Sequence, residues 1–260
     1  MKNKLFHIIL ITLFGFILQS CKKETEQENL SETEIQKPKD SVESVSVEKP
    51  EKDIQYSIEV EKIDSLEYRH FAIKNNINKK KLTKITDFEE AKKLLKGIVE
   101  FDENPDYGEN PLVKKIHFRN GKKFGNSNEY DYYSFIAYYP EEDILLCEGG
   151  HTTDFSFNLK NGQEIEETGN PDYINFSPSG KFRLNGHFGG QECSSYFIQK
   201  KIGNDYVKII QLDEDFEKLT KVWLCIVGES FWADDNTLFL TEASKFGKAK
   251  KFFKVKIIEK

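Results

Sequence analysis

The sequence lacks every short motif that would assign it a reaction. It contains no Gly-x-Ser-x-Gly elbow, no His-Glu-x-x-His helix and no glycine-rich phosphate-binding loop. The acid pairs Glu141-Glu142 and Asp234-Asp235 lie in polar turns, where solvated carboxylates are expected, rather than at a recognisable acid/base site. The motifs therefore identify no substrate, and we expect no cofactor.

An excess of basic residues is also missing. The 260 residues include 38 Lys and Arg against 44 Asp and Glu, which gives a formal net charge of -6. A protein that binds nucleic acid gains much of its affinity by neutralising phosphates. This composition therefore argues against a nucleic-acid partner.

Long apolar runs are absent except at the N-terminus. There, residues 5–18 form an apolar run of about 14 residues, whereas a membrane-spanning helix needs about 20. Lys2 and Lys4 precede this run, and Leu18-Gln19-Ser20-Cys21 ends it. A basic start, a short apolar segment and a small residue before the cleavage site predict a signal peptide over residues 1–20.

Leu18 to Cys21 resembles the lipobox of bacterial lipoproteins. The resemblance implies that Cys21 receives a diacylglyceryl group on its thiol and becomes the N-terminus after cleavage. The lysine-and-acid tract that follows is similar to the export signal of some Bacteroidota surface lipoproteins. We therefore expect lipid anchoring in the cell envelope, at the outer membrane, either exposed on the surface or facing the periplasm. An ordinary secretory signal and an uncleaved membrane anchor are the alternatives.

Residues 21–53 lack aromatic side chains and contain few aliphatic ones, whereas lysines and acids are frequent. So little apolar surface cannot offset the entropy lost when a chain becomes ordered. We therefore predict a lipidated N-terminus and a disordered tether over residues 21–53, followed by a β-rich globular domain over residues 54–260.

The pattern within this domain predicts mainly strands. Alternating apolar residues from Ile54 to Val60 indicate a strand, and a capping box of Thr86 and Glu89 begins one predicted helix over residues 86–101. Further on, an aromatic-rich strand, a polar turn and a second strand occur three times. These repeats cover residues 135–150, 173–188 and 228–243, and we predict a further hairpin behind each.

The repeats resemble blades of a β-propeller. A closed ring needs four or more blades of about 40 residues each, and residues 54–129 are too few to complete one easily. We therefore predict an antiparallel meander that forms a sandwich or open barrel with propeller-like hairpin repeats and one covering helix. A small β-propeller is the alternative. The lysines of the last strand predict that it lies at a sheet edge.

Two glycine-rich turns in successive repeats contain the candidate binding residues. If the repeats stack, both turns lie on one rim, and loops on a rigid β scaffold are common binding sites. The candidate ligand rim consists of His151, Asp154, His187, Gln191 and Glu192. Side chains of these types, with cysteine, could instead bind zinc, but their spacing shows no compact ligand set. A third possibility is that the histidines only hydrogen-bond the backbone of the turns.

The chain has four cysteines, and lipidation of Cys21 would leave three. The envelope permits disulfides, but three cysteines form at most one within a molecule. Cys225 belongs to an apolar strand and is expected to be a buried thiol. The possible disulfide is therefore Cys147–Cys193, which would hold the two histidine turns together.

From the sequence we predict a membrane-anchored binding module for an envelope glycan, peptide or protein. The alternative is an envelope hydrolase or metal-dependent enzyme that uses His151, His187 and nearby acids, and a purely structural role is a third hypothesis. An enzyme needs these side chains to converge in a concave pocket, whereas a binding module needs only a shared exposed surface.

Overall fold

The computed structural model describes residues 54–75, 80–103, 110–125, 132–190, 193–243 and 250–260, without the side chain of His151. The segment from Glu51 to Lys260 forms one compact unit. None of the helices among these described residues has the length and apolar character needed to cross a membrane. The predictions for residues 1–53, including the lipidated Cys21, lie outside the described residues.

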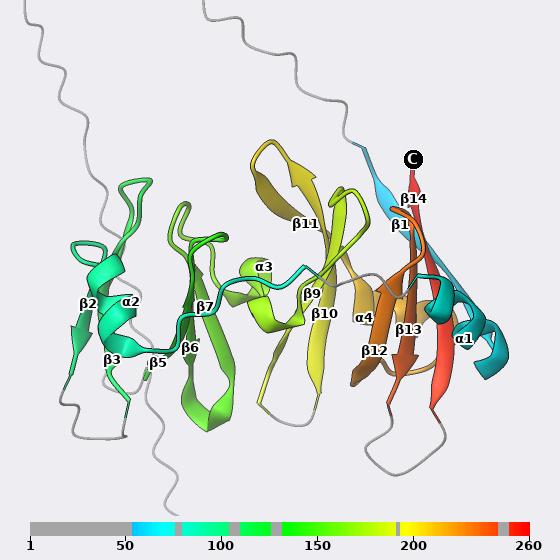
Figure 1. Ribbon diagram of the computed structural model, residues 1–260, viewed down its shortest axis with the longest axis horizontal. Helices are drawn as coiled ribbons and strands as arrows, with labels where there is room; N and C mark the ends of the chain where they lie inside the picture. Colours follow the sequence, from blue (N-terminus) through cyan, green and yellow to red (C-terminus); the bar gives the residue numbers. More distant parts are fainter. Residues whose placement is uncertain (1–53, 76–79, 104–109, 126–131, 191–192, 244–249) are drawn as a thin grey trace, which may run out of the picture. The chain divides into compact units, whose positions relative to one another are not determined.

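The described residues form three antiparallel sheets, in agreement with the mainly β fold that the sequence predicted (Figure 1). None of them closes into a barrel. The first sheet contains β2 (Val99–Asp102), β3 (Leu112–His117), β5 (Ser134–Tyr139), β6 (Ile144–Glu148) and β7 (Asp154–Asn158), with β4 (Lys123–Gly125) paired to β3. The middle sheet has the order β11 (Asp205–Gln211), β10 (Ser194–Ile202), β9 (Phe182–Phe188) and β8 (Asn175–Phe176). The third sheet has the order β1 (Tyr56–Ile63), β14 (Lys251–Glu259), β13 (Thr237–Glu242) and β12 (Val227–Trp232).

All three predicted repeats form hairpins. They are β5–β6, β8–β9 and β12–β13, each joined through the polar turn that the sequence indicated. In the middle sheet the further hairpin is β10–β11, in which Gly203 adopts a φ of 60° that favours glycine. Behind β7 the chain also reverses, at Asn161–Gly162, but the hairpin is reduced to a single antiparallel bridge between Phe157 and Glu164 before the short helix α3 (Ile165–Thr168). β14 pairs with β1 from the other end of the domain.

The prediction that the last strand lies at a sheet edge is wrong. β14 pairs with β1 on one side and with β13 on the other. Its lysines face acids of these neighbouring strands, with Lys254 3.3 Å from Glu61 and Lys251 3.6 Å from Glu242. Lysine is tolerated on this interior strand because acids of the neighbouring strands lie opposite it; the Lys254–Glu61 pair is partly exposed, whereas Glu242 beside Lys251 is only 6% exposed.

Four α-helices accompany the sheets in the described ranges, where the sequence predicted one. The predicted helix is α2 (Phe88–Leu94), but Asp87 rather than Thr86 caps it, accepting a bond from Glu90 N at 2.8 Å. It ends early and gives way to β2. α1 (Ser65–Lys74) begins at Asp64, whose carboxylate accepts bonds from Leu66 N and Glu67 N. α4 (Leu212–Thr220) has an acidic first turn and buries Leu212 and Phe216.

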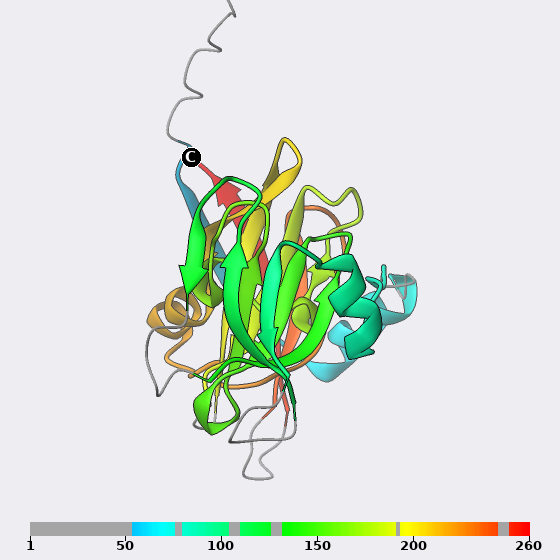
Figure 2. The ribbon, with the colours of Figure 1, turned by 90° about the vertical axis from the view of Figure 1, so that its left-hand side faces the viewer.

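The sheets pack face to face, and in Figure 2 the strands of successive sheets lie behind one another. An apolar core joins the middle sheet to the third sheet. One face of β9 contributes Phe182 and Leu184 to this core, which also contains Trp232, Leu240 and Val255. This buried surface, together with the connection from β11 through Leu212–Thr220 to β12, holds the middle and third sheets as a sandwich.

The opposite face of β9 belongs to a buried polar layer between the first and middle sheets. Asn185 donates from Nδ2 to Thr168 O at 2.8 Å, and Gln199 of β10 donates to Glu167 O at 2.7 Å. Arg183 is only 3% exposed and donates from Nε to Gln199 Oε1 at 2.6 Å. These polar side chains are buried at low cost because each has a hydrogen-bond partner.

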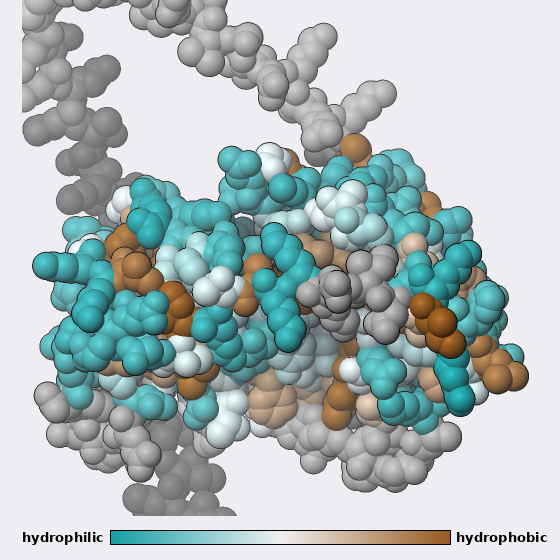
Figure 3. All heavy atoms as spheres, in the orientation of Figure 1, coloured by the Kyte–Doolittle hydropathy of each residue, from teal (hydrophilic) through white to brown (hydrophobic). Residues whose placement is uncertain are grey.

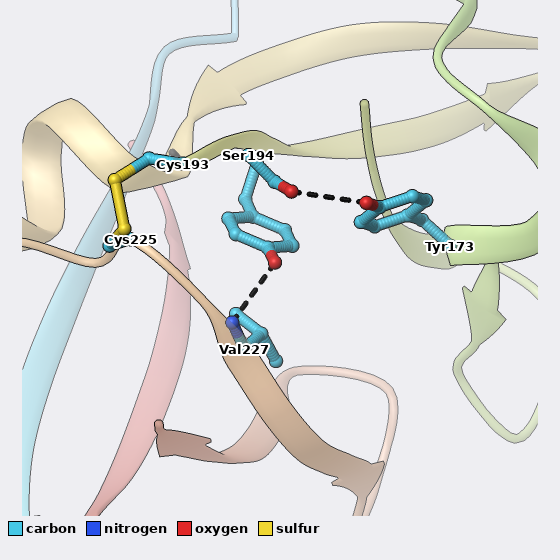
Figure 4. The surroundings of a disulfide bond; sticks show 6 residues. Tyr173, Cys193, Ser194, Cys225 and Val227 are labelled. Atoms are coloured by element: carbon cyan, nitrogen blue, oxygen red, sulfur yellow. Dashed lines mark hydrogen bonds between the residues drawn. A yellow bond between two sulfur atoms is a disulfide. The ribbon is translucent and has the colours of Figure 1, made fainter. Parts of the chain in front are cut away.

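The predicted disulfide Cys147–Cys193 is wrong. Cys193, just before β10, is bonded to Cys225 in the segment that leads into β12 (Figure 4). The backbone sets this pairing, since Ser194 N donates to Cys225 O at 3.0 Å and Val227 N donates to the Tyr196 hydroxyl at 3.0 Å. Cys147 is a free thiol that points into the apolar core of the first sheet, where burial raises its pKa.

Candidate ligand-binding cleft

The structure brings the two glycine-rich turns together, but it does not expose the histidine between them. Asp154 at the start of β7 accepts a hydrogen bond from Phe188 N at the end of β9, at 2.8 Å. His187 is 5% exposed and lies in the polar layer. Gln191, Glu192 and the side chain of His151 lie outside the described residues. Of the candidate ligand rim, the structure therefore shows two side chains: the Asp154 carboxylate, which has a structural role, and the buried His187 imidazole.

The surroundings of His187 keep it neutral. Its Nε2 lies 3.6 Å from Glu166 Oε1, and its Nδ1 has no hydrogen-bond partner in the described part of the chain. Burial lowers the pKa of His187, although the carboxylates of Glu166, Asp154 and Asp213 oppose the shift. A buried neutral imidazole does not face a substrate arriving from solvent.

A cleft of about 1040 Å³ opens at the end of β7 and β9 that lies opposite the glycine-rich turns. β9 runs from Phe182, near the cleft, to Phe188 at the glycine-rich turns, a span of roughly 20 Å at the usual rise per residue. All three sheets contribute to the cleft, together with α1. Its lining includes Ile174–Gly180 of the β8–β9 hairpin, Gly228–Trp232 of β12, and residues of the turns after β5 and β10.

Aromatic side chains form a large part of the cleft wall. Phe176 and Tyr206 are half-buried neighbours with ring centroids 5.8 Å apart. The Arg183 guanidinium packs 3.9 Å from the centroid of the Tyr206 ring, and the Lys80 ammonium lies 5.1 Å from that of Phe176. Ile73 of α1 lines the rim of the cleft and is 81% exposed.

Two carboxylates of the cleft are engaged with the protein itself. Glu142 accepts a bond from Arg183 Nη1 at 2.7 Å. Glu141 accepts bonds from the hydroxyl and backbone N–H of Thr83 at 2.5 and 3.2 Å. Burial acts to raise the pKa of Glu141, but these bonds from Thr83 outweigh it, so the pKa is lowered and the group is ionised at neutral pH. Neither acid is free to act as an acid or base on a ligand.

The lysines of the cleft have fewer charged partners than its acids. Lys80 and Lys201 have no carboxylate within 4 Å in the described segments, while Lys160 lies 3.8 Å from Asp205. Once Arg183 is paired with Glu142, the side near Phe176 and Tyr206 therefore has ammonium groups available to a ligand. The remaining cleft acid, Glu229, lies by α1 and is 3.3 Å from Lys250.

The edge of β12 that faces the cleft already has partners for two carbonyl groups. The Tyr68 hydroxyl donates to Glu229 O at 3.3 Å, and Asn175 Nδ2 donates to Ser230 O at 3.1 Å. The Trp232 indole N–H donates to Asn175 O at 2.9 Å, which links β12 to β8 at the floor of the cleft. The floor is therefore a hydrogen-bonded seam between two sheets.

The cleft has the features of a binding site more than those of a catalytic site. Partly exposed aromatic rings beside a few polar groups are typical of ligand pockets. Among the described residues there is no group of three or more His, Cys, Asp or Glu side chains that could hold a metal ion. The sequence did indicate the turns after β5 and β8 as polar hairpin turns, but it gave no signal that α1 and β12 complete a cleft with them.

Comparisons with known protein families, with curated proteins and with solved structures found no match for this chain.

Proposed function

We propose that the protein is a lipid-anchored binding protein of the bacterial cell envelope, and that the cleft receives its ligand. The observation that carries the proposal is the cleft itself, with half-buried Phe176 and Tyr206 beside Lys80 and Lys201, which have no carboxylate within 4 Å in the described residues. The lipobox-like sequence ending in Cys21 supports the anchor, at the outer membrane. A cleft of about 1040 Å³ that is open to solvent could receive a glycan, a peptide or part of a protein of the envelope.

A hydrolase centred on His187 has less support. His187 is buried in the polar layer, and Asp154 is occupied by the backbone of Phe188. General acid-base catalysis needs a side chain within hydrogen-bond reach of a bound substrate. Neither residue lines the cleft.

Substitution of Cys21 tests the anchor. We expect the wild type to partition into the detergent phase and to carry acyl mass, whereas Cys21→Ala stays in the aqueous phase, because acyl chains contribute about 0.8 kcal/mol per buried methylene. Phase partition and mass spectrometry of the full-length chains measure both properties. An unacylated wild type that partitions like the variant would contradict the lipid anchor.

Substitution of Ile73 tests the cleft. We expect the full chain with Cys21→Ala to retain envelope material on an affinity column, and Ile73→Asp to reduce that retention about tenfold, as loss of about 1.4 kcal/mol would. Leu66→Asp is the matched control, because Leu66 is 74% exposed on the same helix but does not line the cleft. Both variants should have the same melting temperature as the parent. Equal retention by the parent and both variants would remove the cleft from the proposal.

A further inference from the structure

We infer that the cleft binds an acidic saccharide, meaning a pyranose ring that carries a carboxylate. The inference rests on the proposed function and adds the chemical class of the ligand. Three features of the cleft carry it: the state of its backbone edges, its aromatic pair and the distribution of its charges.

The backbone edges disfavour a peptide that would bind by adding a strand. Strand addition needs free N–H and C=O groups along a sheet edge. In the β12 segment that lines the cleft, Asn175 already occupies Ser230 O on the side of β8, and Glu229 O accepts from the hydroxyls of Tyr68 and of Thr241 on the neighbouring β13. β8, the facing edge, is only two residues long. A ligand in this cleft would therefore be recognised by side chains.

The aromatic pair suits a ring with one apolar face. Tyr206 is held in place because its hydroxyl donates to Gly180 O at 2.6 Å and Arg183 packs on its ring, and Phe176 packs against Tyr206 with ring centroids 5.8 Å apart. Rings fixed in this way offer contact area with little loss of side-chain entropy on binding. The C–H face of a pyranose is apolar and flat enough to pack on such a surface, while its hydroxyl groups need polar neighbours. Asn204 and Ser230 are polar residues of the same lining.

The charges favour an anionic form of this ligand. Near the aromatic pair, Arg183 is paired with Glu142, and Glu141 is held by Thr83. Lys80 and Lys201 line the same part of the site without a carboxylate within 4 Å in the described residues. A ligand carboxylate would give each ammonium a charge-assisted hydrogen bond, which is roughly twice as strong as a neutral one.

Calorimetric titration with matched saccharides tests the inference. The full chain with Cys21→Ala is titrated with tetragalacturonate, tetraguluronate, sialyllactose and a heparin-derived tetrasaccharide, and each is compared with its methyl-esterified form. We expect at least one acidic saccharide to bind, its ester to bind about tenfold more weakly, and added salt to weaken the binding of the acid alone. A decapeptide library and inorganic phosphate serve as probes of other ligand classes.

Single substitutions locate the binding. Lys201→Gln and Lys80→Gln should each weaken binding of the acidic saccharide several-fold and leave binding of its ester unchanged. Phe176→Leu keeps the apolar volume but loses the ring, and it should weaken binding of both forms about equally. Lys93→Gln, on the exposed side of α2 and outside the cleft, is the control and should change neither.

The outcomes separate the two proposals. Equal affinity for the acidic saccharide and its ester would overturn the acidic-saccharide inference but keep the proposal of a binding cleft. Peptide binding that Ile73→Asp abolishes and Lys201→Gln leaves unchanged would have the same consequence. The same holds if no saccharide binds while Ile73→Asp still lowers retention of envelope material. If no saccharide binds and Ile73→Asp has no effect on retention, both proposals fail.

Discussion

Arg183→Met is expected to lower the free energy of unfolding by about 3 to 5 kcal/mol, the usual cost of removing one partner from a buried ion pair. Arg183 is 3% exposed and ties the β5–β6 turn of the first sheet to the middle sheet through Glu142. Without the guanidinium, the Glu142 carboxylate loses this donor, and Gln199 Oε1 keeps only the longer bond from Asn185 Nδ2, at 3.3 Å. Urea denaturation at neutral pH measures the loss.

A control and a double variant distinguish this effect from a general loss of charge. Lys181, two residues before Arg183, forms a substantially exposed ion pair with Glu259. We expect Lys181→Met to lower the free energy of unfolding by less than about 1 kcal/mol. Arg183→Met combined with Glu142→Met should be more stable than Arg183→Met alone, because no buried carboxylate is then left unpaired. If the double variant is no more stable than Arg183→Met, Arg183 stabilises the fold mainly by stacking on Tyr206 and not through the ion pair.

Local patterns in the sequence predicted the strands well because the repeats contain their own turn signals. Each of the three hairpins has aromatic or aliphatic residues on both sides of a short polar turn, and the chain reverses where the turn residues allow it. The arrangement of the sheets was less accessible. β14 is an interior strand because β1, more than 180 residues earlier, pairs with it, and no local pattern encodes that partner.

The candidate site was largely missed for a related reason. The sequence indicated His151 and His187 because histidine is chemically versatile and both lie in glycine-rich turns. The side chains of β9 alternate between an apolar core and a polar layer, and His187 lies in the polar layer. The cleft depends instead on common residue types, such as phenylalanine, tyrosine and lysine, brought together from α1 and all three sheets. Such residues acquire meaning only from their placement in the fold.

The two interfaces of the middle sheet differ in physical character, and this difference bears on the site. The interface with the third sheet is mainly an apolar core with a few hydrogen bonds at its margin, such as Trp232 Nε1 to Asn175 O, whereas the interface with the first sheet is a network of directional hydrogen bonds. Glu142 and Arg183 belong to that network, and Glu142 also lines the cleft. The network therefore fixes the cleft wall, and substitutions within it should alter ligand binding as well as stability.

Reduction of the disulfide is expected to destabilise the protein by roughly 3 to 4 kcal/mol, since Cys193 and Cys225 are 32 residues apart and a loop of that size loses considerable entropy when it is closed in the unfolded chain. The folded state should survive, because Ser194 N still bonds to Cys225 O, and the Tyr173 hydroxyl still pairs with Ser194 Oγ (Figure 4).

Denaturation with and without a phosphine reductant measures this effect. The double variant Cys193→Ala/Cys225→Ala should match the reduced wild type and should not respond to reductant. Cys147→Ala should keep the full response, because Cys147 is a buried free thiol in the first sheet. If Cys147→Ala instead abolished the response to reductant while Cys225→Ala retained it, the disulfide would join Cys147 to Cys193, and the connection between β10 and the segment before β12 would have to depend on backbone hydrogen bonds alone.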